Sequence, residues 1–427
     1  MDRTNIGAAF VNGLITELNL DSRLQTLVTS IFYVFYVSLE LPSNILLKQV
    51  KPRNWFAFIS IAWSIICMLQ ALAKTSTVFI VFRALLGAVE SGFAPGMLAY
   101  LPYWYTRDEI GFRMSIFFAS IPVAGIIGNP IAAGLASLKT SLKPYQMIFL
   151  VEGAATILFG IASFFILQNY PETCTFLTIE ERDVLVKKLK ADQGLATKAK
   201  LSVMSSIKAI FDWKTGVYCF GLFTINNCVN LISIFGPTLM KALKFSSVNS
   251  TYLATVPCVA GLIAIIISYF IPKRVPLYAR VAAMNAMGAI FLALLAFGKG
   301  LFLRMFSFTL FGFFVYPAIP IFLSWLSVNQ GGIAKRLIVS AIAFSCGNIS
   351  GAIIPTMFTT KHAPNFVSGF VFILSSMVIL VVLVLALAIY YTKENEKKTN
   401  NPIDVSHLSE DEQQMMYNNH PQFRYTL

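Results

Sequence analysis

Two charged residues interrupt one of the longest apolar stretches of the sequence. Arg83 and Glu90 lie within residues 77–101, seven positions apart, which is two turns along one face of a helix. Because charge is costly inside a lipid-facing segment, such residues indicate a functional site. A guanidinium stays charged and can grip a carboxylate with two hydrogen bonds, whereas a buried glutamate can take up a proton. A structural ion pair that fixes helix packing is the alternative.

Further ionisable groups occupy other apolar stretches. Asp2 and Arg3 stand before a short apolar run at 4–15, and Glu152 lies within 145–167. For Glu152 we favour a structural role over a functional one.

Glu40 lies in the last third of the stretch 24–47, close to the basic residues that follow it. We expect it to pair with one of them, as a cytosolic gate or as a structural lock. The candidate partners are Lys48, Lys51 and Arg53.

The composition indicates a chain that is embedded in lipid. Hydrophobic residues make up 56% of the 427 positions and charged residues only 12%, with a mean hydropathy of +0.70. Soluble domains carry about 25% charged residues, so much of this chain must face an apolar solvent. The net charge of +13 does not indicate nucleic-acid binding, because the basic residues stand between apolar runs and form no basic domain.

An all-α membrane protein of two six-helix bundles follows from the spacing of the apolar stretches. A spanning helix needs about 20 mostly apolar residues. The run at 4–15 is shorter, and we count it as part of a first helix. Eleven stretches qualify: 24–47, 55–73, 77–101, 115–138, 145–167, 215–240, 252–271, 281–297, 305–328, 337–358 and 366–391.

The predicted organisation is a bundle at 1–167, a polar linker at 168–214, a second bundle at 215–391 and a mobile polar tail at 392–427. In the linker, Thr178 and Glu181 have the spacing of a capping box, which predicts one amphipathic helix. Lys and Arg are more numerous in the loops on the linker side, so both chain ends are predicted to be cytosolic.

The sequence does not indicate an enzyme. The three histidines, His362, His407 and His420, lie outside the predicted spans, and no metal-ligand or nucleophile pattern is present. No cofactor is therefore expected.

Several short motifs, in a fixed order, resemble a known family over nearly the whole chain. The chain is similar to the anion:cation symporter branch of the major facilitator superfamily, and specifically to fungal allantoate permeases. The resemblance implies the major facilitator fold and proton-coupled uptake of a small organic anion or vitamin, such as allantoate, nicotinate, pantothenate or biotin. The motifs are 2–7 (DRTNIG), 41–48 (LPSNILLK), 83–96 (RALLGAVESGFAPG), 176–182 (FLTIEER), 325–329 (WLSVN), 335–336 (KR), 347–348 (GN) and 420–425 (HPQFRY).

The resemblance also implies roles for particular residues. Related sugar-acid symporters use an Asp-Arg pair in the first helix, and in the fourth an Arg followed seven residues later by a Glu. The matching positions assign proton coupling to Asp2 and Glu90, and substrate binding to Arg3 and Arg83, with polar contacts added from the second bundle. Those added contacts are Asn226, Asn227 and Asn348.

Three features depart from the family pattern. Relatives have about half a helix and a tail before the Asp-Arg pair, so the first helix is expected to be incomplete here, through a shortened gene model or a genuine truncation. Residues 271–274 (IPKR) stand where the family often has an Asp-Arg loop, and residues 215–240 contain no basic residue.

We therefore expect a monomeric transporter in the plasma membrane. Its partners would be a small organic anion or vitamin, protons and the lipid bilayer, with no nucleic acid. Two alternatives stay open: a nutrient sensor that keeps the fold and binds without transport, and a facilitator without proton coupling.

Overall fold

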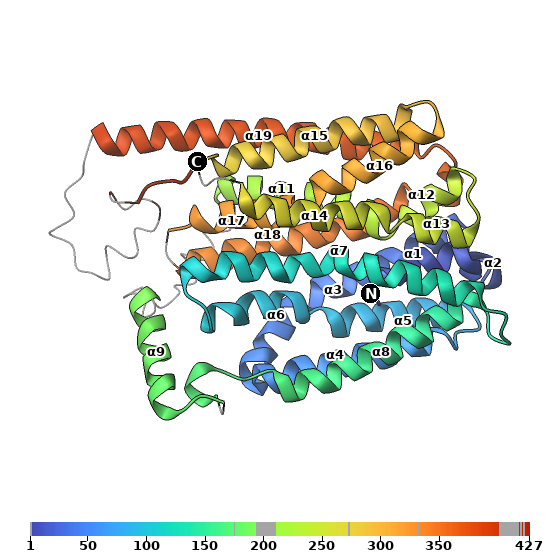
Figure 1. Ribbon diagram of the computed structural model, residues 1–427, viewed down its shortest axis with the longest axis horizontal. Coiled ribbons are helices and arrows are strands. Elements are labelled where there is room, and N and C mark those ends of the chain that lie inside the picture. The colour runs from blue at the N-terminus through green and yellow to red at the C-terminus, as the bar shows by residue number, and fades with distance from the viewer. Residues whose placement is uncertain are drawn as a thin grey trace.

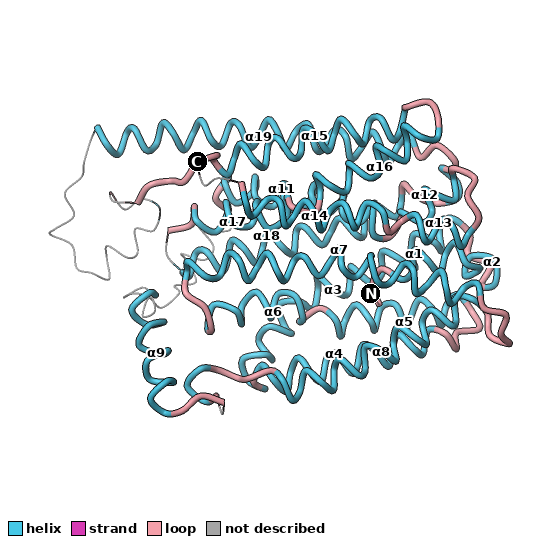
Figure 2. The backbone as a smooth tube through the Cα atoms, in the orientation of Figure 1, coloured by secondary structure: helices cyan, strands magenta, loops and turns pink. Residues whose placement is uncertain are grey.

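The helices of the protein lie side by side along its long axis (Figure 1). The linker helix α9 (Ile179–Gln193) lies at one end, which we call the linker end, and α2 (Ile15–Glu17) lies at the other, which we call the opposite end. Figure 2 draws every regular element within the described part of the chain as helix. The computed structural model describes residues 2–174, 176–193, 211–271, 274–331, 333–400, 418, 421 and 423–427.

The N-terminal half begins with a short interrupted segment and continues with five long spans. Short 3-10 turns follow at Leu101–Tyr103 and, in the linker, at Pro171–Thr173. The N-terminal elements are α1 (Asn5–Ala9), a π-helical turn (Phe10–Leu14), α2, α3 (Ser22–Val50), α4 (Pro52–Gln70), α5 (Ser76–Glu90), α6 (Phe93–Tyr100), α7 (Arg107–Ser137) and α8 (Pro144–Ile166).

The C-terminal half contains six spans in its described residues. Its 3-10 turns lie at Ile354–Thr356 and Thr360–His362. The helices are α11 (Trp213–Ser233), α12 (Gly236–Ala242), α13 (Ser247–Leu253), α14 (Val256–Phe270), α15 (Leu277–Phe297), α16 (Leu301–Val315), α17 (Ala318–Val328), α18 (Ile333–Ile353) and α19 (Val367–Asn400).

The hydropathy-based prediction of the spans is confirmed. In the described residues, 11 helical segments are long and apolar enough to cross a membrane, and each coincides with one predicted stretch. The largest differences are at helix ends: α19 continues to Asn400, whereas the prediction ended at Tyr391. The segment at residues 5–17 is not among the 11.

Four of the spans are broken by proline. A proline inside a helix lacks the backbone N–H, and its ring clashes with the carbonyl of the residue four positions earlier. In each broken span the break falls at the residue four positions before the proline. Pro95, for example, follows the break at Ser91 between α5 and α6. The prolines are Pro95, Pro237, Pro257 and Pro320.

Small residues bring the long helices close together. In the N-terminal half α3 packs along α5 and α4 along α8, and α3 also packs on α18 of the other half. At Gly87 a Cβ atom would lie 2.1 Å from the carbonyl oxygen of Phe32, so only glycine permits this contact between α5 and α3. This contact fixes the part of α5 that carries Arg83.

Hydrogen bonds join the two halves in the part of the molecule toward the opposite end. They connect the π-helical turn and the first half of α3 with α11 to α13 and with the residues in and after α18. The bonds are Asn12 to Thr251 (3.2 Å), Lys241 to the Val11 carbonyl (3.1 Å), Gln25 to Thr360 (3.2 Å), Ser30 to the Ala352 carbonyl (2.7 Å) and Tyr33 to Asn230 (3.1 Å).

The end of the C-terminal tail is docked, which corrects the expectation of a mobile tail. Tyr425 is 5% exposed and stacks on Tyr391 with ring centroids 4.2 Å apart. Asn395 exchanges two hydrogen bonds with the backbone of Tyr425, and Asn329 does the same with Thr426. These amide pairs replace the hydrogen bonds that water would otherwise make, so residues 425–426 hold a defined place at the linker end.

The linker helix α9 begins directly after Thr178. The Thr178 backbone N–H donates to Glu181 (2.9 Å), and the Glu181 N–H donates to the Thr178 hydroxyl (3.3 Å), as the capping-box spacing predicts. Lys188 of α9 forms an ion pair of 2.9 Å with Glu109 at the start of α7, which ties the linker helix to the N-terminal half.

Candidate functional site

Arg83 lies in the interior of the protein, and both terminal nitrogens of its guanidinium lack a hydrogen-bond partner among the described residues. Its side chain is fully buried (0% exposed); Nε donates to the carbonyl of Val28 (3.2 Å), and Cζ lies 5.1 Å from the centroid of the Phe32 ring. Nη1 and Nη2 have no partner among the described residues. The guanidinium is therefore anchored on α3 through Nε and has both terminal nitrogens available to an anion.

Glu90 is the last residue of α5, directly before the break at Ser91. Its Oε2 atom is buried and has no hydrogen-bond partner in the described part of the chain. The described charges that act on it most strongly are Arg3, Asp2 and Arg83, in that order. No ion pair joins Arg83 to Glu90 among the described side chains. The alternative interpretation, a direct structural ion pair within α5, therefore does not hold in this structure.

Arg3 and Asp2 approach the same region from the start of the chain. Arg3 Cζ lies 5.9 Å from the centroid of the Tyr33 ring, and both Arg3 and Arg83 act electrostatically on the Tyr33 hydroxyl. Asp2 is 4% exposed and accepts a hydrogen bond from Trp63 Nε1 (3.0 Å) through Oδ2. Three of the charged residues proposed from the sequence, Arg3, Arg83 and Glu90, therefore lie around Tyr33, and Asp2 acts on Glu90.

Tyr33 connects this cluster with the C-terminal half. Its hydroxyl donates to Asn230 Oδ1 (3.1 Å), and Asn230 Nδ2 donates to the Ser350 hydroxyl (2.8 Å). Sequence reasoning missed Tyr33, because tyrosine is common in apolar spans. The available signal was its position in α3 seven residues before Glu40, which places both side chains on one face of that helix.

The asparagines proposed from the second half are placed differently from one another. Asn227 is fully buried with both amide atoms unpaired among the described residues, and Asn226 lies beside Gly347 of α18. Neither forms a hydrogen bond to Arg3 or Arg83 within the described chain. Asn348 is 5% exposed and lies next to Glu40, at the contact between α18 and α3.

The expected pairing of Glu40 with a basic residue is wrong for the two candidates whose side chains are described. Arg53 donates to the carbonyl of Phe164 and lies over its ring, with Cζ 4.4 Å from the centroid. Lys51 is exposed at the end of α3. Glu40 is 3% exposed and lies against Ser345 and Asn348 of α18 instead. The side chain of Lys48 is outside the described residues.

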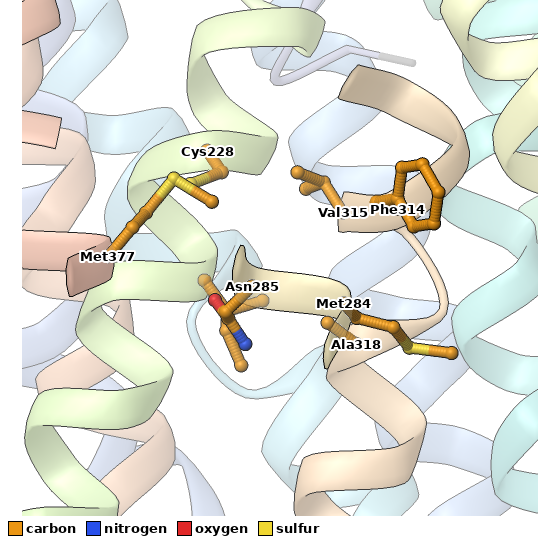
Figure 3. Close-up of a pocket in the computed structure, with 8 residues that line it drawn as sticks. Cys228, Met284, Asn285, Phe314, Val315, Ala318 and Met377 are labelled. Carbon is orange, nitrogen blue, oxygen red and sulfur yellow. The ribbon is translucent and has the colours of Figure 1, made fainter. Parts of the chain in front are cut away.

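An apolar pocket in the C-terminal half is separate from this cluster (Figure 3). Its polar side chain, Asn285, uses Nδ2 in a hydrogen bond of 2.9 Å to the carbonyl of Val281. The pocket offers no charged group to a ligand. It is lined by Ile225, Cys228, Met284, Asn285, Phe314, Val315, Ala318 and Met377. The described residues contain no group of three His, Cys, Asp or Glu side chains that could hold a metal ion.

Comparison with known sequences agrees with this arrangement. Residues 1–355 match the sequence profile described as Major Facilitator Superfamily. A protein of Agrobacterium vitis named "Putative tartrate transporter" is 29% identical over 416 residues, which cover 94% of this chain and 89% of that protein. The "Major facilitator-type transporter hxnP" of Emericella nidulans is 25% identical over 86% of this chain and 76% of its own length.

Among solved structures, the chain is similar to a bacterial homologue of the human lysosomal transporter Spinster, solved in an inward-facing, unoccupied conformation. The TM-score is 0.57, at 14% sequence identity over 91% of this chain and 92% of that chain. At this identity the likeness supports the fold of two helical halves.

Proposed function

Because this chain belongs to the major facilitator superfamily, we propose that it is a secondary active transporter that couples proton uptake to the uptake of a small organic anion or vitamin. The substrate class we propose comprises allantoate, nicotinate, pantothenate and biotin, as the motifs of the fungal allantoate permeases imply. The name of the Agrobacterium vitis relative adds tartrate, another small carboxylate, to the compounds that merit testing.

The observation that carries the proposal is the Arg83 guanidinium, fully buried with Nη1 and Nη2 unpaired among the described residues. Burying a charge without compensation costs several kcal/mol, about 3–5 kcal/mol where one partner of a pair is missing. A carboxylate that accepts hydrogen bonds from both nitrogens would remove this cost. Arg3, whose Cζ lies 5.9 Å from the centroid of the Tyr33 ring, supplies the second positive charge for the same anion.

Glu90 couples the anion to a proton in this proposal, with Asp2 as the second carboxylate in electrostatic range. In the empty site Glu90 balances the charge of Arg3. When a substrate carboxylate binds to the arginines, the two negative charges compete for the same positive charges in a medium of low dielectric constant. Protonation of Glu90 relieves this competition, so anion binding favours proton binding.

Alternating access would exchange the contacts between the halves. The hydrogen bonds from Tyr33, Ser30 and Gln25 to the C-terminal half hold the opposite end closed, and their release would open it. Both arginines act on the Tyr33 hydroxyl, so a substrate bound to them would lie near the residue that holds the halves together. Substrate binding is thereby linked to the conformational change.

We further propose that the linker end and both chain ends face the cytosol, that the transporter acts as a monomer, and that it resides in the plasma membrane. The excess of Lys and Arg in the loops at the linker end supports this orientation.

Uptake of a labelled panel of carboxylates in permease-deficient yeast, at acidic and at neutral pH, tests the proposal. We expect one compound to accumulate, more strongly at acidic pH. Glu90→Gln should abolish accumulation against the gradient, whereas the matched surface variant Glu17→Gln, in an exposed ion pair with Lys143, should not. Surface-expressed protein that binds the compound without flux would indicate a sensor, and flux without accumulation would indicate a facilitator.

A further inference from the structure

Two of the motifs found in the sequence lie together at the linker end, and the proposed transport mechanism uses neither of them. The first, residues 325–329, lies at the end of α17, and the second includes residues 423–425 of the tail. Trp325 Nε1 donates to the carbonyl of Thr426 (3.2 Å), and Asn329 bonds to both the N–H (2.8 Å) and the carbonyl (2.9 Å) of that residue. The tail thus docks on the end of α17 through its backbone.

The part of α19 at and beyond the end of the predicted span holds the tail from a second helix. Tyr391, Asn395 and Lys398 follow one another at intervals of four and three residues, so they share one face of α19. Tyr425 stacks on Tyr391, and its N–H and carbonyl both bond to Asn395 (2.8 Å each). Lys398 Nζ donates to the carbonyl of Phe423 (3.2 Å). The polar extension of α19 therefore has a ligand.

Two consecutive residues are held by their backbone, each from a different helix. Asn395 binds the N–H and carbonyl of Tyr425, and Asn329 binds those of Thr426, as an opposing residue does in an antiparallel strand pair. Backbone pairing of this kind supplies affinity for a peptide but does not depend on its side chains. We call the following residues the tail-docking site: Trp325, Asn329, Tyr391, Asn395 and Lys398.

The ring of Tyr425 supplies the specificity. Lys214 of α11, which is paired with Asp212 (3.4 Å), donates to the Tyr425 hydroxyl (3.3 Å). The ammonium groups of Lys214 and Lys398 lie 5.6 and 5.5 Å from the centroid of this ring, within the range of a cation–π contact. The ligand chemistry that fits is a peptide segment with a free backbone and a tyrosine side chain.

The docking contacts are complete within one half of the protein. In the described part of the chain, every hydrogen bond from residues 423–427 to a helix goes to the C-terminal half. Figure 1 shows this end of the chain beside the start of α15, where the Leu277 N–H donates to the Leu427 carbonyl (3.0 Å). The site therefore does not depend on how the two halves are oriented.

We propose that the tail-docking site is a peptide-binding site whose ligand is residues 423–427 of this chain, bound reversibly. The ligand is recognised by the backbone of Tyr425 and Thr426 and by the Tyr425 ring. Because the segment is tethered to α19, its effective concentration at the site is on the order of millimolar, so a modest intrinsic affinity keeps it bound. The proposal does not rest on the transport function.

Cutting the tether tests the intrinsic affinity of the site. Full-length protein with a site-specific protease sequence between residues 400 and 418 would be purified and cut, and the tail fragment that elutes with it in gel filtration would be quantified by mass spectrometry. At micromolar concentration the fragment should stay bound. An excess of about 100-fold of a synthetic peptide of residues 418–427 should replace about 99% of it, since equal ligands share a site by mass action.

Variant peptides test the recognition without changing the protein. A Tyr425→Ala peptide should displace less than about one tenth as much fragment, because it lacks the ring that stacks on Tyr391. In the protein, Asn395→Ala should release the fragment on cutting, whereas Glu396→Ala, at the exposed neighbouring position, should retain it. The proposal is overturned if the cut wild type loses its fragment at once, if the wild-type peptide displaces none, or if the Tyr425→Ala peptide competes equally well.

Discussion

A single methyl group at Gly351 should open the contact between the halves at the opposite end. Gly351 of α18 faces Tyr33 of α3, and a Cβ atom at this position would lie 2.1 Å from the Tyr33 ring, where ordinary contact begins at 3.4 Å. The ring cannot move aside, because it is 2% exposed and its hydroxyl is bonded to Asn230. Gly351→Ala must therefore separate α3 from α18.

The size of the effect follows from the overlap. Inserting a methyl group into a well-packed contact costs about 1–3 kcal/mol. If this cost falls only on the conformation in which the opposite end is closed, the ratio of open to closed protein rises by about 5- to 150-fold. Uptake should fall accordingly, since a transporter that rarely closes one end cannot complete its cycle.

Spin labels at the exposed positions Lys139 and Lys361, one on each half at the opposite end, would report the separation by pulsed dipolar spectroscopy. Gly351→Ala should enlarge the population at long distance. Gly134→Ala is the matched control, because a Cβ there would lie 3.9 Å from its nearest neighbour, Tyr252 Oη. Identical distance distributions for Gly351→Ala and wild type would refute the reasoning.

Three further outcomes are expected. Arg83→Lys should lower the uptake rate at limiting substrate by about 10- to 100-fold, because a lysine cannot form the bidentate pair of hydrogen bonds with the substrate carboxylate. Initial-rate uptake kinetics would measure this decrease. Tyr425→Ala should lower the free energy of unfolding by about 2–4 kcal/mol through loss of the stack on Tyr391, measured by thermal unfolding, while Tyr425→Phe stays close to wild type. The hydrogen bond from Lys188, followed by the Thr106 backbone, lowers the pKa of Glu109 from 4.5 to about 2. The contribution of this carboxylate to the docking of α9 should be complete above pH 4.5 and should be lost as the pH falls toward 2. Hydrogen exchange of the α9 amides should therefore become faster over this pH range in the wild type. The Glu109→Gln variant should show no such pH dependence.

The spans could be predicted from sequence because hydropathy reports burial in lipid directly. The helix breaks inside them could have been predicted as well, since Pro95 and Pro320 each stand four residues after a break. Those breaks matter for function: the one at Ser91 ends α5 at Glu90 and leaves its carboxylate at a helix terminus.

The partners of the buried charges could not be predicted, because they depend on how helices rotate against one another. Glu40 is near Lys51 and Arg53 in sequence, but α3 turns it toward Asn348 of the other half. The hydropathy of the polar tail likewise gave no reason to expect that Tyr425 packs against the helices at the linker end. That docking depends on hydrogen bonds between the Tyr425 backbone and the Asn395 side chain, which hydropathy does not report.

Proton movement during substrate uptake is the most direct test of the central claim. Purified protein would be reconstituted into liposomes that contain a pH-sensitive dye, and the substrate identified by the uptake panel would be added outside. We predict acidification of the lumen in step with anion entry, and its loss in Glu90→Gln protein that still exchanges labelled for unlabelled substrate. Anion entry without acidification in the wild type would contradict proton coupling through Glu90.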